Sequence, residues 1–164
     1  IESHAGYIVR WQIAGPYTKD GIKADDLLDS AFAPESDDAD HVKWQPLTII
    51  DPNDPWSFDL EKAIGGRTRC AYLRAQVWPD HGTEAVLRIG SDDGVKVWLN
   101  DQVVHTNNVF RGLTMDEDTI HVELKEGWNR LMLKISQGSG GWKFSCRITM
   151  PDGEPLEGIR FSAE

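Results

Sequence analysis

The feature that most constrains the fold is an alternating stretch at residues 85–104, AVLRIGSDDGVKVWLNDQVV. Ala85, Leu87 and Ile89 are apolar and stand at every second position, which is the spacing of a strand with one buried face. An acidic loop flanked by glycines, residues 90–94, then interrupts the alternation. This pattern predicts a strand that ends in a short charged loop, after which the chain turns back.

The alternation resumes directly after that loop. A second apolar-polar run, residues 95–99, leads into Asn100-Asp101. Asn and Asp both tolerate positive φ, so this pair is typical of a hairpin turn. A third strand is expected to begin at Gln102, which gives two consecutive hairpins within the stretch.

The same pattern recurs along the chain between Gly and Pro turn signals. The helix signal is weak, with one helical turn predicted at residues 25–32 inside a long polar connection, residues 17–56. Nine or ten short strands are typical of an all-β jelly-roll β-sandwich, and the length fits one domain, residues 1–164. The other predicted strands are residues 6–14, 57–60, 70–77, 119–124, 128–136, 142–149 and 159–161.

The order of the loops predicts where they lie. In a sandwich whose strands are roughly aligned, successive connections alternate between the two ends. The loops at residues 90–94, 107–118 and 137–141 should therefore meet at one end, and the turns at residues 100–101 and 126–127 at the other. Long loops held at one end of a rigid scaffold are where binding sites usually lie.

Charge and hydropathy exclude two classes of partner. The formal net charge is −10, and an acidic surface repels nucleic-acid phosphates and anionic lipids. The sequence has no run of about eighteen apolar residues that would predict a membrane span. It starts at Ile1 rather than Met, so we expect a processed chain or a module cut from a longer protein.

Cysteine, histidine and tryptophan each limit the chemistry. Cys70 and Cys146 both fall in predicted strands, and are either two half-buried thiols or, in an exported protein, one disulfide. The five histidines show no metal-ligand spacing. Seven tryptophans exceed the average of roughly one per hundred residues, and tryptophan serves either a core or a platform for sugars.

Several segments resemble a known module, above all GSDDGVKVWLND, NNVFRGLTMDED and LKEGWNRLMLKISQGSGGWKFSCRI. They look like a galactose-binding-like jelly-roll module that accompanies bacterial secreted sugar-active enzymes, and WQIAGPY, FAPE and VKWQPL resemble its start. The SDDG segment is also similar to the protective-antigen-type lectin domain, in which paired aspartates hold a calcium ion that contacts sugar. Asn100-Asp101 stands where the module usually has Asn-Gly, a departure that affects a turn.

The resemblance implies a non-catalytic carbohydrate-binding module that targets a sugar-active enzyme to a polysaccharide. Its partners would be a polysaccharide or oligosaccharide and the catalytic domain of the parent protein, outside the cell or in the periplasm. The alternative is a structural accessory domain that packs against a catalytic domain and binds no glycan. No enzyme activity is expected, because the sequence has no G-x-S-x-G motif and no phosphate-binding loop.

A calcium site is one interpretation of the acidic loops. Calcium takes roughly six to eight oxygen ligands, and Asp92, Asp93, Asp116 and Asp118 would supply carboxylates if the loops converge. The other interpretation is that Asp92 and Asp93 are scaffolding, with carboxylates that accept backbone N–H bonds.

The candidate sugar-binding residues lie in the same loops. Arg and Asn present planar groups that suit sugar hydroxyls, although Arg111 could instead pair with Asp116 or Asp118. Trp142 follows two glycines that allow a ligand to approach, yet the alternation of its strand also places it in the core. The predicted ligand-binding residues are Arg111, Asn107, Asn108, Asp92, Trp142 and Phe110.

Overall fold

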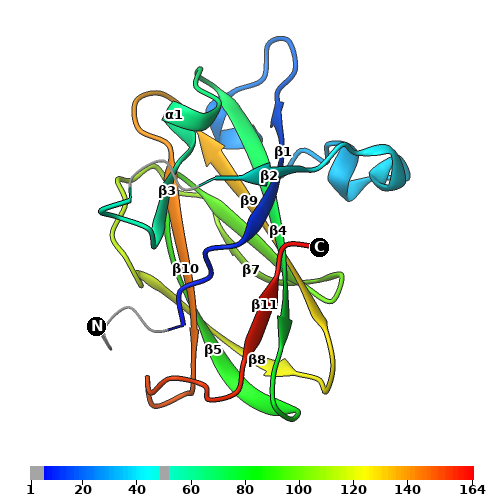
Figure 1. Cartoon of the computed structure of the whole chain (residues 1–164). Coiled ribbons are helices and arrows are strands. Elements are labelled where there is room, and N and C mark those ends of the chain that lie inside the picture. Colours follow the sequence, from blue (N-terminus) through cyan, green and yellow to red (C-terminus); the bar gives the residue numbers. More distant parts are fainter. Residues whose placement is uncertain (1–5, 49–51) are drawn as a thin grey trace.

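Two antiparallel sheets packed face to face form the protein, as the computed structural model shows for residues 6–48 and 52–164 (Figure 1). The larger sheet has the strand order β2-β1-β4-β9-β6-β7, with β11 also paired to β4, and the smaller has the order β3-β10-β5-β8. The predicted all-β jelly-roll sandwich is confirmed. The larger sheet contains β1 (Trp11–Tyr17), β2 (Gln45–Leu47), β4 (Arg69–Trp78), β6 (Val95–Leu99), β7 (Gln102–Asn107), β9 (Asn129–Gln137) and β11 (Arg160–Ser162); the smaller contains β3 (Ser57–Asp59), β5 (Thr83–Asp92), β8 (Asp118–Leu124) and β10 (Lys143–Thr149).

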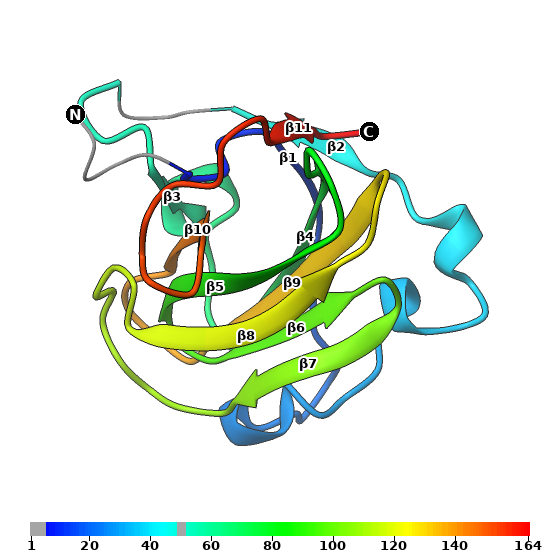
Figure 2. The ribbon, with the colours of Figure 1, turned by 90° about the horizontal axis from the view of Figure 1, so that it is seen from below.

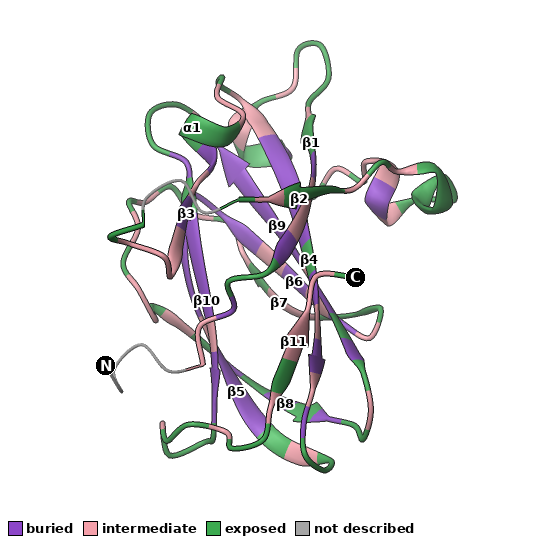
Figure 3. Ribbon diagram, in the orientation of Figure 1, coloured by how far each residue is buried: buried purple, intermediate pink, exposed green. Residues whose placement is uncertain are grey.

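The core lies between the two sheets, and buried and more exposed residues alternate along strands such as β6 and β8 (Figure 3). The register places Leu73 of β4 beside Leu133 of β9, and Leu133 beside Val97 of β6, and all three are fully buried. This is the period-two pattern expected of strands with one buried face. Cys70 and Cys146 are free buried thiols in different sheets, so the disulfide alternative is wrong.

The long connection between β1 and β2 contains more structure than the one helical turn predicted for it. It contains three short 3-10 turns, η2 (Ala24–Asp26), η3 (Ala33–Glu35) and η4 (Ala39–His41), and it buries Leu27, Leu28 and Pro34. Only η2 falls in the predicted helical turn at residues 25–32. Strand β2 was not predicted within this connection.

The remaining helix, α1 (Leu60–Ala63), is a single turn that follows β3. No helix in the described ranges is long and apolar enough to cross a membrane.

The connections alternate between the ends of the sandwich as expected. We call the end formed by residues 92–94, 108–117 and 138–141 the loop end, and the opposite end the turn end. At the turn end Asn100 donates a hydrogen bond from Nδ2 to Oδ1 of Asn129 (3.0 Å), which joins the two plain turns. Also at this end, the rings of Trp78 and Trp128 meet edge to face with centroids 5.1 Å apart.

Candidate functional site

Asp93 ties the three connections of the loop end together. Its Oδ1 accepts a hydrogen bond from the backbone N–H of Arg111 (3.0 Å), and its Oδ2 accepts one from the backbone N–H of Gly138 (2.9 Å). The predicted convergence of these loops is therefore confirmed. Asp93 is 7% exposed and serves as the scaffold that one interpretation of the sequence described.

Asp92 has a different environment, although its cis peptide bond joins it directly to Asp93. Burial raises the pKa of Asp92 to about 6, the charge of Asp93 adds to the shift, and Lys143 opposes it. Within the described residues, no N–H group donates a hydrogen bond to this carboxylate. Gly141 allows the close approach, because a Cβ at that position would lie 2.6 Å from Oδ2 of Asp92.

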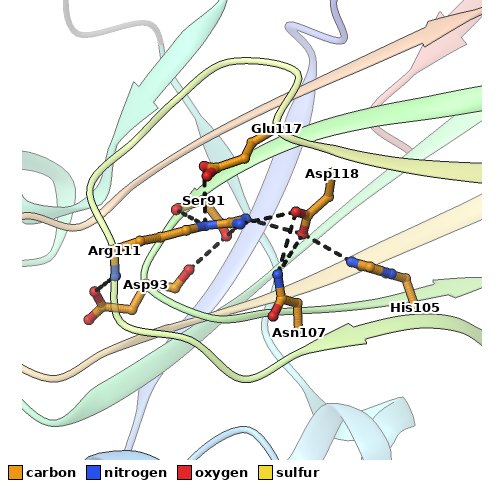
Figure 4. A network of polar contacts seen from close by, with 7 residues as sticks. All are labelled: Ser91, Asp93, His105, Asn107, Arg111, Glu117 and Asp118. Carbon is orange, nitrogen blue, oxygen red and sulfur yellow. Dashed lines mark hydrogen bonds and ion pairs between the residues drawn. The ribbon is translucent and has the colours of Figure 1, made fainter.

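Arg111 is the centre of a polar network at the same end (Figure 4). Its Nη1 and Nη2 donate to the two carboxylate oxygens of Asp118 (3.0 and 3.1 Å). Its Nε donates to the backbone oxygen of Ser91 (3.0 Å), and Nη2 also donates to Oγ of Ser91 (2.8 Å). The Arg111 side chain is only 13% exposed, so it holds the β7–β8 loop against β5. This geometry matches the alternative in which Arg111 pairs with Asp118, and ligand binding by Arg111 stays a prediction.

Asp118 collects the rest of this network. His105 contacts its Oδ2 at 3.0 Å, and Nδ2 of Asn107 donates to the same oxygen (3.2 Å). Burial alone would raise the pKa of Asp118, but the hydrogen bonds from Arg111, His105 and Asn107 outweigh burial and lower the pKa to about 2. Asn107 thus donates to Asp118, and its role as a sugar contact stays a prediction.

Asp116 belongs neither to the Asp92–Asp93 pair nor to the Asp118 network. Its Oδ1 accepts a hydrogen bond from the hydroxyl of Tyr7 (3.0 Å), and its Oδ2 pairs with Nη2 of Arg147 (2.9 Å). The four aspartates predicted as one metal set are therefore divided, since Asp118 is bound to Arg111. In residues 6–48 and 52–164, no group of three or more His, Cys, Asp or Glu side chains is arranged to hold a metal.

Asp92 and Asp93 remain the residues that fit a cation. Two adjacent carboxylates repel each other, and a bound cation would offset both charges. Each Asp93 oxygen accepts one backbone hydrogen bond and keeps a second lone pair for a ligand. The site would hold a metal with these two carboxylates, and backbone carbonyls and water would complete the shell.

The two aromatic residues predicted to bind sugar differ in burial. Trp142 is fully buried and donates from Nε1 to the backbone oxygen of Ile135 (3.2 Å), so it belongs to the core and is not a sugar platform. Phe110 is 58% exposed and lies over Gly138. Asn108 is exposed and donates to the backbone oxygen of Asp25 (2.7 Å), which fixes its orientation. The surface of the loop end therefore offers Asn108 and Phe110, and the carboxylate of Asp92 is buried at the same end.

Ser91, His105 and Glu117 in the Arg111 network, and Tyr7 and Arg147 around Asp116, were not identified from the sequence. Tyr7 lies 109 positions from Asp116 along the chain. Period-two patterning indicates which face a strand residue takes, but it carries no information on which distant side chain will be its partner.

Comparisons with known proteins concern the fold. A scan of protein-family models gives no match, and no curated protein matches the sequence. Among solved structures, the Epithelial Adhesin 9 A domain from Candida glabrata, in complex with Galb1-3GlcNAc, has a TM-score of 0.55 at 11% identity and covers 96% of this chain and 90% of its own. A beta-glucosidase from Kluyveromyces marxianus has a TM-score of 0.52 at 15% identity and covers 84% of this chain and 14% of its own.

A third structure, an anti-sigma factor domain-containing protein, has a TM-score of 0.55 at 14% identity. The match covers 96% of this chain, which spans about half (48%) of that protein. Such different proteins at such low identity share an architecture and not a common set of site residues. The chain thus has the all-β sandwich fold found in an adhesin domain and in part of a glycosidase.

Proposed function

We propose that the chain is a non-catalytic carbohydrate-binding module whose loop end binds a glycan through calcium held by Asp92 and Asp93. The observation that carries the proposal is the Asp92 carboxylate, which is 9% exposed, has a raised pKa and lies beside Asp93. A buried, ionised carboxylate destabilises the fold until a bound cation or a proton neutralises its charge.

Calcium would supply the contact to the sugar. A calcium ion with open coordination positions binds oxygen ligands, and a pair of sugar hydroxyls can fill two of them. Asn108 lies on the surface nearby for hydrogen bonds, and exposed Phe110 offers an apolar face to a pyranose ring. With only two carboxylates, the calcium affinity belongs to the weak range of extracellular modules, on the order of 10⁻⁴–10⁻³ M.

Two comparisons support this proposal. The adhesin domain that shares the fold along 96% of this chain carries a disaccharide in its structure. The same fold covers 14% of a beta-glucosidase chain, which is consistent with a module that serves a sugar-active enzyme outside the cell or in the periplasm. In this role the module holds a parent enzyme on its polysaccharide, and the chemistry belongs to another domain.

A structural accessory domain is the second candidate. The side chains of Arg111, Asn107 and Trp142 are all directed into internal contacts. A loop end built for packing against a catalytic domain would have such contacts without binding any glycan.

A glycan array in calcium and in EDTA separates the two candidates. Binding should appear in millimolar calcium, disappear in EDTA and be lost in Asp92→Asn. The matched control is Asp152→Asn, which removes the same charge from an exposed position outside the loop end. Glycan binding that is unchanged in EDTA would remove calcium from the proposal. Absence of binding to any glycan at millimolar concentration would favour the structural accessory domain.

A further inference from the structure

A groove of about 630 Å³ lies on the outer face of the larger sheet, away from the loop end. The strand register brings Arg74 of β4 beside Met132 of β9, and Met132 beside Trp98 of β6, so the three form one row across the groove floor. Each of them alternates with a buried neighbour that faces the core, so the row faces outward. No residue of the candidate calcium site lines this groove.

The wall of the groove is a fixed part of the fold. It is formed by the connection that carries η3 and η4, which lies along the outer side of the larger sheet (Figure 2, cyan). Lys134 of β9 is fully buried beneath it, and its Nζ donates to the backbone oxygens of Leu28 (2.9 Å) and Ser30 (2.6 Å) and pairs with Glu35 (2.8 Å). The groove is therefore formed before any ligand binds.

Arg74 is the group on the floor that lacks a counter-charge. Its Nε donates to Oε1 of Gln12 (2.8 Å), and its guanidinium carbon lies 4.4 Å from the ring centre of Trp44. In the described part of the chain no carboxylate pairs with it, and partial burial lowers the pKa of Arg74. Arg130, by contrast, pairs with Asp101 at the same groove. Arg74 thus presents an oriented, unpaired cation to the groove.

The rim restricts which anion can reach this cation. Glu35 is engaged by Lys134 and Asp101 by Arg130, but Asp40 and Glu164 also line the groove. A dense polyanion would be repelled by these two carboxylates, whereas a single carboxylate meets less repulsion and can pair with Arg74. Next to Arg74, Met132 and Trp98 provide an apolar and aromatic surface of the kind on which pyranose rings stack.

We infer that this groove is a second glycan-binding site, which takes a mainly neutral oligosaccharide with an isolated uronic acid. The uronate carboxylate pairs with the Nη groups of Arg74, which a guanidinium can bind in a bidentate manner. A neighbouring sugar ring lies on Trp98 and Met132. The site needs no metal, so it is independent of the calcium-dependent binding proposed for the loop end.

Two pairs of oligosaccharides, each with an acidic and a neutral member, test this inference by NMR titration in EDTA. One pair is 4-O-methylglucuronosyl-xylotriose and xylotetraose, and the other is the hyaluronan and chitin tetrasaccharides. The indole N–H signal of Trp98 reports binding in the groove. At least one acidic probe should shift this signal. The same probe should bind at least tenfold more tightly than its neutral partner, and its affinity should fall as salt is added.

Variants identify the residue responsible. Arg74→Gln should lower the affinity for the acidic probe at least tenfold. Arg74→Lys should give an intermediate affinity, because it keeps the charge but loses the planar guanidinium group. Arg10→Gln removes the same charge from an exposed position outside the groove and should leave the affinity unchanged. Trp98→Ala lacks the reporter signal, so its binding is measured by calorimetry; it should bind acidic and neutral probes alike more weakly through loss of the stacking surface.

The contrary outcomes are also distinct. If neither acidic probe shifts Trp98 at millimolar concentration, or if acidic and neutral probes bind equally, the inference is wrong. If tetraglutamate shifts Trp98 as strongly as the acidic sugars, the groove binds acidic peptides rather than glycans. Because EDTA is present throughout, a negative result here leaves calcium-dependent binding at the loop end untouched.

Discussion

Asp92 and Asp118 lie at the same end of the sandwich, yet their pKa values move in opposite directions. Burial raises the pKa of Asp92 to about 6, whereas hydrogen bonds from Arg111, His105 and Asn107 outweigh burial and lower that of Asp118 to about 2. Asp118 is paired with Arg111, so its ionised form stabilises the fold. Asp92 receives no hydrogen bond from any N–H group that the structure describes, so its ionised form destabilises the fold. The two therefore act on stability in different pH ranges.

Asp92 should make the metal-free protein less stable as the pH rises. Its pKa in the folded state exceeds the ordinary value of 3.8, so the folded protein holds a proton that the unfolded chain has lost between about pH 4 and pH 6. The resulting loss of stability by pH 7.5 is at most about 3 kcal/mol, since each pKa unit is worth about 1.4 kcal/mol. Denaturant unfolding of the wild type and Asp92→Asn in EDTA, at pH 4 and pH 7.5, measures the difference. Identical pH dependence in the two proteins would contradict the assignment.

Arg111→Ala should lower the stability of the fold, and its effect should not be limited to weaker ligand binding. It leaves the 10% exposed Asp118 without its bidentate partner, which costs about 3 kcal/mol for a buried pair. Arg130→Ala is the control, because its pair with Asp101 is largely exposed and is worth less than about 1 kcal/mol. Thermal unfolding at pH 7 compares the two variants. Equal shifts would show that the Arg111 network is no stronger than a surface pair.

The acid limb of the stability curve provides a second check on the same network. Asp118 stabilises the fold above its unfolded pKa, and this contribution is lost as the pH falls from about 4 toward 2. The Arg111→Ala variant should therefore lose less stability than the wild type over this range. A steeper loss in the variant would be inconsistent with an Arg111–Asp118 pair.

At the scale of elements, the β1–β2 connection shows the limit of period-two patterning. Residues 131–135 alternate as a strand with Lys134 on the outer face, where a lysine is expected to reach water. Lys134 is instead fully buried, because a segment about a hundred positions earlier in the chain covers it. Strand faces follow from local spacing, whereas the covering of a face depends on long-range contacts that one sequence does not reveal. The missed strand β2 has the same cause, since its residues QPL carry a proline and lack alternation.

Lys134→Met should release this connection from the sheet. The change leaves Glu35 and two backbone oxygens without their buried donor, which costs about 3–5 kcal/mol when one partner of a buried pair is removed. Hydrogen exchange should quicken at residues 27–41 more than in β5 of the opposite sheet. Lys96→Met is the control, since Lys96 is only half-buried on the neighbouring strand. Unchanged exchange in Lys134→Met would mean that the other contacts of the segment, among them buried Leu27 and Leu28 and the Asn108–Asp25 hydrogen bond, are enough to hold it.

At the scale of the whole molecule, binding of calcium should appear as added stability. A ligand of the native state raises the free energy of unfolding by about 2.7 kcal/mol at a hundredfold excess over its dissociation constant. The melting temperature should therefore rise in about 10 mM calcium relative to EDTA, given the weak affinity expected of two carboxylates. Asp92→Asn should abolish the rise and Asp152→Asn should keep it. An unchanged melting curve for the wild type would contradict the calcium site and leave only the scaffolding role of Asp93.

The architecture and the loop end could both be predicted, because alternation assigns the strands and connection order assigns the ends. The use of individual side chains could not. Arg111 and Asn107 have the donors that a sugar needs, but Asp118 binds both of them. Trp142 follows a flexible glycine pair and is nevertheless a core residue. Residue type identifies what a side chain can contact, and only the packed structure decides whether the partner is internal.

The pair of tryptophans at the turn end has an optical consequence. The rings of Trp78 and Trp128 are 5.1 Å apart and inclined at 80°. At this distance we expect their electronic transitions to couple and to give two bands of opposite sign in circular dichroism. Trp78 belongs to β4 and Trp128 precedes β9, so the paired signal persists only while that edge-to-face contact is intact. The tryptophan pair is thus an intrinsic spectroscopic probe of the packing at the turn end. A dye or a metal at the other end can be followed at the same time and in the same sample.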